Sequence, residues 1–145
     1  MLSNTSRYAI RALTYLAINH NSGKKIGIKK IAEDLDIPSP FLGKILQTLT
    51  KQKILSSTKG PNGGFSISDT TTKTRLIDII KIIDGDDLFE KCLISNKHCK
   101  ELKDNPCSLH DQYEPIRDNI NKMFTDHTIG QLAEKYKASK IKIDL

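Results

Sequence analysis

Two short amphipathic segments, separated only by a turn that ends in proline, constrain the fold of this chain most. Apolar residues recur at helical spacing over residues 28–35 and again over residues 39–51. Pro38 biases the residue before it away from helix, so the first helix must end there. Ser39 can cap the second helix, with Pro40 at its first helical position. This pattern is typical of a helix-turn-helix.

The exposed face of the second helix carries side chains suited to reading DNA. This face is polar and basic, and residues 39–51 contain no acidic residue. We expect it to lie in the major groove or against flanking phosphates, with Lys44 and Gln47 reading bases. The residues expected to contact DNA from this helix are Ser39, Phe41, Lys44, Gln47, Thr48 and Lys51.

A glycine-rich hairpin is predicted after this helix. Short alternating runs at residues 54–57 and 65–68 indicate two strands, and the tip between them is rich in residues that tolerate positive φ. A flexible turn alone is the simpler interpretation. Beside a basic helix, however, the pattern favours a wing that approaches the phosphate backbone or the minor groove. The wing residues expected to contact DNA are Lys59, Gly60, Asn62, Gly63 and Gly64.

The distribution of charge agrees with a polyanion-binding first half. Residues 1–65 hold ten Lys and Arg against three acidic residues, whereas residues 66–145 hold thirteen against fourteen. No apolar run approaches the roughly 20 residues of a membrane span, and the first residues lack the layout of a signal peptide. We therefore expect a cytoplasmic protein in a reducing setting, without a membrane partner.

Three cysteines lie close together in the second half of the chain. Cys92, Cys99 and Cys107 are the only cysteines, and His110 follows the last one at C-x-x-H spacing. An odd number of thiols in a polar segment of a reducing compartment points to metal or redox chemistry. We expect residues 90–109 to be irregular, because they are polar and contain Asn105-Pro106.

The remaining segments predict further helices over residues 6–19, 76–83 and 109–125, and a last one from Thr128, where Gln131 completes a capping box. The tail from Lys137 is charged and expected to fray. The predicted fold is mainly α with a small β-hairpin wing: a winged helix-turn-helix plus a long C-terminal dimerisation helix. The expected units are a DNA-binding domain over 1–85, a cysteine-containing loop over 86–110, and a dimerisation helix with a C-terminal helix over 111–145.

Together these motifs resemble the Rrf2 family of winged-helix transcription regulators, which includes iron–sulfur regulators of the IscR and NsrR type. The resemblance covers nearly the whole chain. It implies a homodimer that binds a partly palindromic operator on double-stranded DNA, with crossed helices at about 109–125 as the dimer contact. An amphipathic helix that follows a polar loop needs an apolar partner, although packing on its own domain is the alternative. The motifs that carry the resemblance are Arg7-Tyr8-Ala9, Ile31-Ala32, residues 41–49, residues 59–65, Asp84-Gly85 and the three cysteines.

The resemblance also implies an iron–sulfur cluster on Cys92, Cys99 and Cys107, expected as [2Fe–2S] with [4Fe–4S] as the alternative. In some relatives an acidic residue of the first helix completes the ligand set, but no Asp or Glu precedes Glu33 here. His110 is the better candidate for the fourth ligand, and His98 is its rival. Aerobic preparation could leave such a site empty, or with a disulfide among exposed thiols. The open alternatives are a zinc site and a cluster-free thiol- or ligand-responsive regulator.

An enzyme is not expected from this sequence. Gly-x-Ser-x-Gly, His-Glu-x-x-His and phosphate-loop patterns are all absent from the chain. The hypothesis is a DNA-binding transcription regulator whose operator affinity depends on the state of its cysteine site. By linkage, such a protein must bind DNA differently with and without the cluster.

Overall fold

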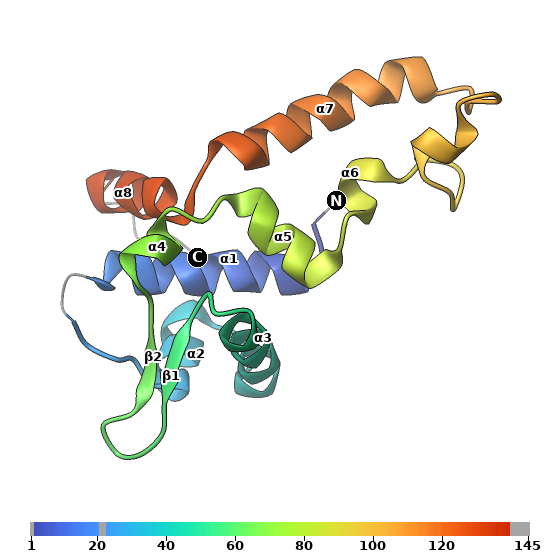
Figure 1. Ribbon diagram of the computed structural model, residues 1–145. Helices are drawn as coiled ribbons and strands as arrows, with labels where there is room; N and C mark the ends of the chain where they lie inside the picture. The colour runs from blue at the N-terminus through green and yellow to red at the C-terminus, as the bar shows by residue number, and fades with distance from the viewer. Residues whose placement is uncertain (1, 21–22, 140–145) are drawn as a thin grey trace.

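The computed structural model describes residues 2–20 and 23–139, and it confirms a mainly helical fold with one small antiparallel sheet. Figure 1 shows α1 running through the middle of the molecule, the hairpin and α3 on one side of it, and α7 on the other. The elements are α1 (Asn4–Ile18), α2 (Ile28–Leu35), α3 (Ser39–Lys51), β1 (Ser56–Thr58), β2 (Gly64–Ser66), α4 (Asp69–Thr72), α5 (Leu76–Asp84), α6 (Asp87–Glu90), η2 (Cys99–Leu102, a 3-10 helix), α7 (His110–Asp126) and α8 (Ile129–Ser139).

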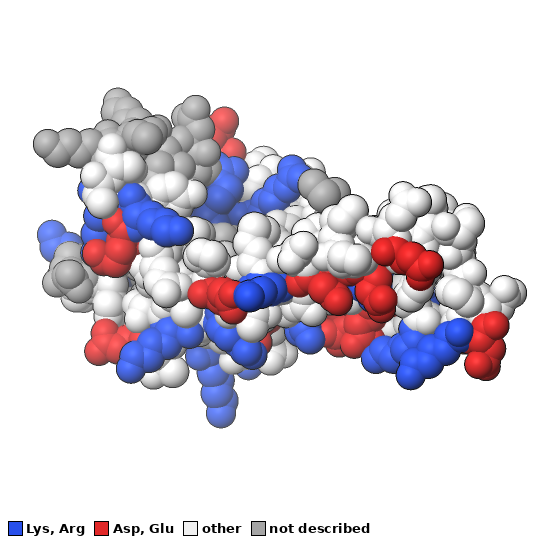
Figure 2. Space-filling model, turned by 90° about the horizontal axis from the view of Figure 1, so that it is seen from above, with Lys and Arg blue, Asp and Glu red and all other residues white. Residues whose placement is uncertain are grey.

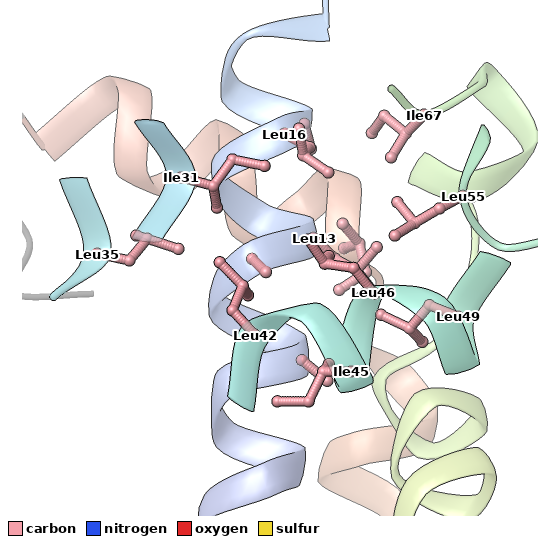
Figure 3. Packing of buried hydrophobic residues seen from close by; sticks show 14 of the residues in the cluster. Leu13, Leu16, Ile31, Leu35, Leu42, Ile45, Leu46, Leu49, Leu55 and Ile67 are labelled. Carbon is pink, nitrogen blue, oxygen red and sulfur yellow. The ribbon is translucent and has the colours of Figure 1, made fainter. Parts of the chain in front are cut away.

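The core surrounds α1, which packs against α2, α3, α5 and α8. Ser3 caps α1 by accepting a hydrogen bond from the backbone N–H of Ser6 at 3.0 Å. Figure 3 shows Leu13 and Leu16 of α1 facing leucine and isoleucine side chains from α2, α3 and the flanks of the hairpin. Leu42, Leu46 and other members of this cluster are completely buried. Because these side chains are tightly packed, the cluster fixes the orientation of α3 relative to α1.

The helix-turn-helix forms where the sequence predicts it, but its cap differs. α2 ends at Leu35, and its C-cap residue Asp36 adopts left-handed φ and ψ of 51° and 49°. The prediction that Ser39 caps α3 is wrong. Pro38 occupies the N-cap position without a side-chain cap, and its carbonyl accepts from the N–H groups of Phe41 and Leu42 at 3.0 and 3.1 Å. Pro40 is therefore the second helical residue and not, as predicted, the first, and because it has no N–H, one backbone donor fewer needs a partner.

The hairpin is shorter and slightly shifted relative to the predicted strands. β1 and β2 pair antiparallel with Ser57 opposite Phe65. On its other side Phe65 exchanges two backbone hydrogen bonds with Ile26, at 2.8 and 2.9 Å. The chain at Ile54 is unavailable for pairing, because its carbonyl accepts from the Thr71 hydroxyl at 2.7 Å. The base of the hairpin is therefore fixed to the segment before α2 and to α4.

The C-terminal helix packs on the first one. Ile129 and Ala133 of α8 are buried in the cluster around α1. Thr128 and Gln131 form the predicted reciprocal cap, with hydrogen bonds of 2.9 and 3.2 Å. The expected fraying from Lys137 is not seen up to Ser139, because α8 continues to that residue; residues 140–145 lie outside the described part.

The cysteine segment lies at the end of α7 that is distant from α8 (Figure 1). Residues 90–109 are less irregular than predicted, since they include η2; α6 ends at Glu90, where that range begins. Local backbone bonds hold the segment together, including that from the Cys92 N–H to the Lys97 carbonyl at 2.9 Å. Within residues 2–20 and 23–139, no helix combines the length and the apolar character needed to cross a membrane.

Candidate DNA-binding surface and cysteine site

One face of α3 is free of contacts with the core. Leu42, Ile45, Leu46 and Leu49 bury the opposite face. Phe41 keeps 64% of its surface exposed although it is aromatic. The Thr48 hydroxyl donates to the Lys44 carbonyl at 3.0 Å and retains its lone pairs for an external donor. All the residues predicted to contact DNA from this helix are exposed: Ser39, Phe41, Lys44, Gln47, Thr48 and Lys51.

The tip of the hairpin combines exposed and enclosed residues. Lys59, Gly60 and Asn62 are exposed, whereas Gly63 and Gly64 are partly buried. A Cβ atom on Gly63 would lie 2.2 Å from the Thr58 carbonyl oxygen, and one on Gly64 would lie 2.6 Å from that of Ile26. These two glycines are therefore needed for the shape of the tip, whatever else they contact.

A basic residue that the sequence analysis did not select also lies on the hairpin. The Lys25 ammonium group donates to the Thr58 hydroxyl at 2.7 Å, and both side chains are exposed. Lys25 comes from the segment before α2, so only the tertiary pairing of Ile26 with Phe65 brings it to β1. Apart from its positive charge, nothing in the sequence around Lys25 indicates that it lies beside the hairpin.

The opposite face of the molecule has a different character. Figure 2 views the molecule from the side of α7 and shows basic and acidic side chains interspersed around a broad area of uncharged ones. This face has no block of a single sign, which a phosphate-binding surface would need. On the face of α3 and the hairpin, which this view does not show, Lys25, Lys44, Lys51 and Lys59 are exposed.

The three thiols are close enough to influence one another, and none forms a disulfide. Hydrogen bonds from the backbone N–H groups of Ser95 and Ile94 lower the pKa of the Cys92 thiol, and contacts with Cys107 and Cys99 add to this effect. The neighbouring Cys92 raises the pKa of Cys107. Cys92 is therefore the thiol of this pair that ionises first.

The thiols and imidazoles do not form a preassembled metal site. Within the described ranges, no group of three or more His, Cys, Asp or Glu side chains is arranged to hold a metal ion. The donor set has the chemistry of a soft-metal site, but the segment would need to rearrange to close it.

The two candidate histidines have different surroundings. His98 lies 3.0 Å from Glu90 through Nδ1 and 3.4 Å from Asp87 through Nε2, so both of its ring nitrogens have carboxylate neighbours. His110 is the first residue of α7, and its Nε2 lies 3.6 Å from a Glu114 carboxylate oxygen. His110 borders the same pocket as Cys99. It is therefore better placed than His98 to join a thiol in binding a ligand.

Comparison with known proteins decides the family. The Rrf2 family, described as iron-dependent transcriptional regulators, matches residues 2–135. The chain belongs to this family. A protein of Aquifex aeolicus (strain VF5), by name an HTH-type transcriptional regulator, is 37% identical over 132 residues, which cover 91% of this chain and 90% of the relative. The Rrf2 chain is thus a transcriptional regulator, not an enzyme.

Solved structures show the same fold at low sequence identity. CymR, the global cysteine regulator of B. subtilis, superposes with a TM-score of 0.75 at 18% identity, covering 93% of this chain and 97% of its own. T. potens IscR superposes with a TM-score of 0.72 at 18% identity, covering 97% and 91%. The Rrf2 winged-helix architecture is therefore shared throughout the described chain.

Proposed function

We propose that this Rrf2 regulator reads its operator with the exposed face of α3 and contacts the flanking backbone with the hairpin. The observation that carries the proposal is the exposed face of α3, which contains no acidic residue. Four buried residues on the opposite side of the helix fix this face in place, and the neighbouring hairpin carries Lys59 at its tip. Gln47 and Lys44 are suited to base edges, and each good base contact contributes about 1–3 kcal/mol of discrimination. Lys25 extends the basic surface along β1.

The regulator acts as a homodimer on a partly palindromic operator. α7 buries only one of its residues against its own chain, Arg117. Ile116 and Met123 keep 56% and 50% of their surfaces exposed, and they border an apolar groove of about 420 Å³. A second copy of α7 would cover this groove with the same kind of side chains, as a two-fold interface requires.

The cysteine segment is proposed to hold an iron–sulfur cluster on Cys92, Cys99 and Cys107, with His110 as the fourth ligand. Support comes from the mutual contacts of the three thiols and from the shared pocket of Cys99 and His110. When bound, such a cluster supplies a redox-sensitive link between these residues. The protein residues themselves connect η2 to the start of α7, so a change in this segment reaches the proposed dimer helix directly.

A cluster-free, thiol-responsive regulator is the second candidate. It is favoured by the absence, in the described residues, of a group arranged to hold a metal ion. The structural relative CymR is by name a cysteine regulator. Under this alternative, Cys92 would be the first thiol to react, because its pKa is lowered by backbone N–H donors. A zinc site remains a third possibility for the same donor set.

The DNA-binding proposal is tested with Lys59→Ala. Removing one phosphate contact should weaken binding to all sequences and reduce the slope of log affinity against log salt by about one unit. Fluorescence anisotropy over a salt series, with specific and unrelated duplexes, measures both effects. The matched control is Lys81→Ala, which removes a lysine from α5. An unchanged slope for Lys59→Ala would place the hairpin away from the DNA.

The cysteine proposal is tested on protein purified without oxygen. A cluster predicts visible absorbance with matching iron and sulfide content, and each of Cys92→Ala, Cys99→Ala and Cys107→Ala should abolish both. Operator affinity at fixed salt should then differ between loaded and stripped protein. Colourless, iron-free protein with normal cysteine-dependent DNA binding would instead support the thiol-responsive alternative. Zinc bound in a one-to-one ratio with the protein would support the zinc-site alternative.

A further inference from the structure

Phe41 is an exposed aromatic residue on a helix face that is otherwise polar and basic. It keeps 64% of its surface exposed, and no other large hydrophobic residue within residues 2–20 and 23–85 is exposed. The remaining exposed hydrophobic side chains of the described chain lie in the cysteine segment or on α7. A phenyl ring that stays in water gives up the free energy of its burial, so an apolar partner from outside the chain would stabilise a complex at this position.

The place of Phe41 in α3 directs its ring toward the bases of a bound duplex. Phe41 lies in the first turn of α3, and the N-terminal residues of a recognition helix are the ones that contact base edges. Its backbone N–H already donates to the Pro38 carbonyl at 3.0 Å, so the ring is the part left for an outside contact. Lys44 and Thr48 follow at i+3 and i+7 and are also exposed, so the three side chains form one stripe along the helix.

The major groove of duplex DNA offers this ring one kind of apolar partner. Base edges there carry hydrogen-bond donors and acceptors, and the apolar group among them is the 5-methyl of thymine. Stacking on a base requires an unstacked or single strand, and wedging an apolar side chain between base pairs is a minor-groove device. A phenyl ring on a major-groove helix is therefore best matched by the thymine methyl group.

We propose that Phe41 reads thymine in each half-site through an apolar contact between its ring and the 5-methyl group. The inference rests on the proposed function, because it requires α3 to lie in the major groove. Lys44 and Gln47 can form hydrogen bonds with guanine and adenine, so the methyl contact specifies a further base pair that these two residues do not read. Burial of one methyl group corresponds to about a fourfold change in affinity.

The test replaces thymine by deoxyuridine, which lacks the methyl group and keeps every hydrogen-bonding atom of the base. The probe is the duplex that the full-length chain selects from a random-sequence pool in vitro, synthesised with each thymine replaced in turn. Fluorescence anisotropy at fixed salt measures the affinity of each version. We expect affinity to fall about fourfold at one thymine position in each half-site and to stay unchanged at the other thymines.

Substitutions in the protein assign the methyl contact to Phe41. Phe41→Ala should bind the thymine and deoxyuridine duplexes equally, whereas Phe41→Leu keeps an apolar side chain and should retain part of the difference. The matched control is Lys44→Ala on the same stripe, which should weaken binding of both duplexes and keep their ratio. Because Phe41 is exposed, Phe41→Ala should fold normally, as checked by circular dichroism and the thermal unfolding midpoint.

Three outcomes would overturn the inference. They are a selected duplex without thymine, equal affinity for every thymine and deoxyuridine pair, and a difference that persists in Phe41→Ala, since another residue would then read the methyl group. If Lys44→Ala and Lys59→Ala still weaken binding in these cases, the proposed function stands and only the thymine contact fails. Unchanged DNA binding by both lysine variants would instead contradict the proposed function itself.

Discussion

At the scale of single residues, Gly64 shows how one backbone position sets the shape of the hairpin. Its φ of +146° is rarely adopted by other residues, and a Cβ there would lie 2.6 Å from the Ile26 carbonyl oxygen. Gly64→Ala should reduce the free energy of unfolding by about 1–3 kcal/mol, measured by urea denaturation.

Gly43→Ala is the matched control for this substitution. Gly43 lies within α3, and a Cβ there would meet only the end of the Ile28 side chain, at 3.4 Å. Alanine is the better helix former, so stability should stay the same or rise by up to about 1 kcal/mol. Equal effects of the two substitutions would contradict the geometry assigned to the hairpin.

Tyr15 gives a prediction about alkaline pH. Burial and the 2.5 Å hydrogen bond to Asp34 raise the pKa of Tyr15 to about 12, above its ordinary value of 10.0. Because the folded-state pKa is the higher one, this contribution to stability is complete below pH 10 and is lost as the pH rises through 12. The bond joins α1 to α2.

Tyr15→Phe should remove this part of the pH dependence of unfolding. Urea denaturation between neutral pH and pH 11 measures it, and absorbance of tyrosinate identifies the late-titrating group in the native protein. Tyr136→Phe on α8 is the control and should keep the wild-type pH dependence. A parallel loss of stability in Tyr15→Phe and the native chain above pH 10 would show that Tyr15 is not the group responsible.

At the scale of elements, α3 separates two roles on neighbouring residues. Leu46 is fully buried, and Gln47 beside it is exposed. Leu46→Ala should destabilise the fold by about 2–5 kcal/mol, whereas Gln47→Ala should change stability by less than about 0.5 kcal/mol and reduce discrimination between operators. Urea unfolding and competition binding measure the two effects. Equal stability losses would contradict the assigned faces.

The same helices show which elements could be predicted from the sequence. α2 and α3 were predicted correctly because apolar spacing and proline act within a few residues. α4 was missed because its cap depends on a reciprocal contact between Ser68 and Thr71 in only four residues. The wrong cap at Ser39 arose because two prolines lie within three positions, and residue type alone does not decide which begins the helix.

The candidate site was predictable in composition but not in arrangement. Exposure of Lys44, Gln47 and their neighbours follows from helical period. The position of Lys25 beside β1 carries no local signal, because it depends on the pairing of Ile26 with Phe65. Spacing identified the cysteines, and the structure brings the three thiols near one another, but spacing alone does not show whether a fourth ligand joins them.

At the scale of the whole molecule, the exposed apolar side of α7 predicts the oligomeric state. Ile116→Glu places a charge in the proposed interface, and an unpaired buried charge costs about 3–5 kcal/mol. The dimer should therefore dissociate at least about a hundredfold more readily, as measured by sedimentation equilibrium. Lys122→Gln changes the net charge by the same amount on the exposed side and should leave the dimer intact. An Ile116→Glu dimer of unchanged affinity would exclude this face as the interface.

The packing of α8 against α1 has a consequence for biosynthesis. Ile129 and Ala133 complete the cluster around α1, which is translated before them. Until α8 has left the ribosome, a nascent chain therefore exposes the apolar surface of α1 that α8 covers. A chain terminated before Ile129 would lack this cover, and we expect it to be degraded faster than the intact chain.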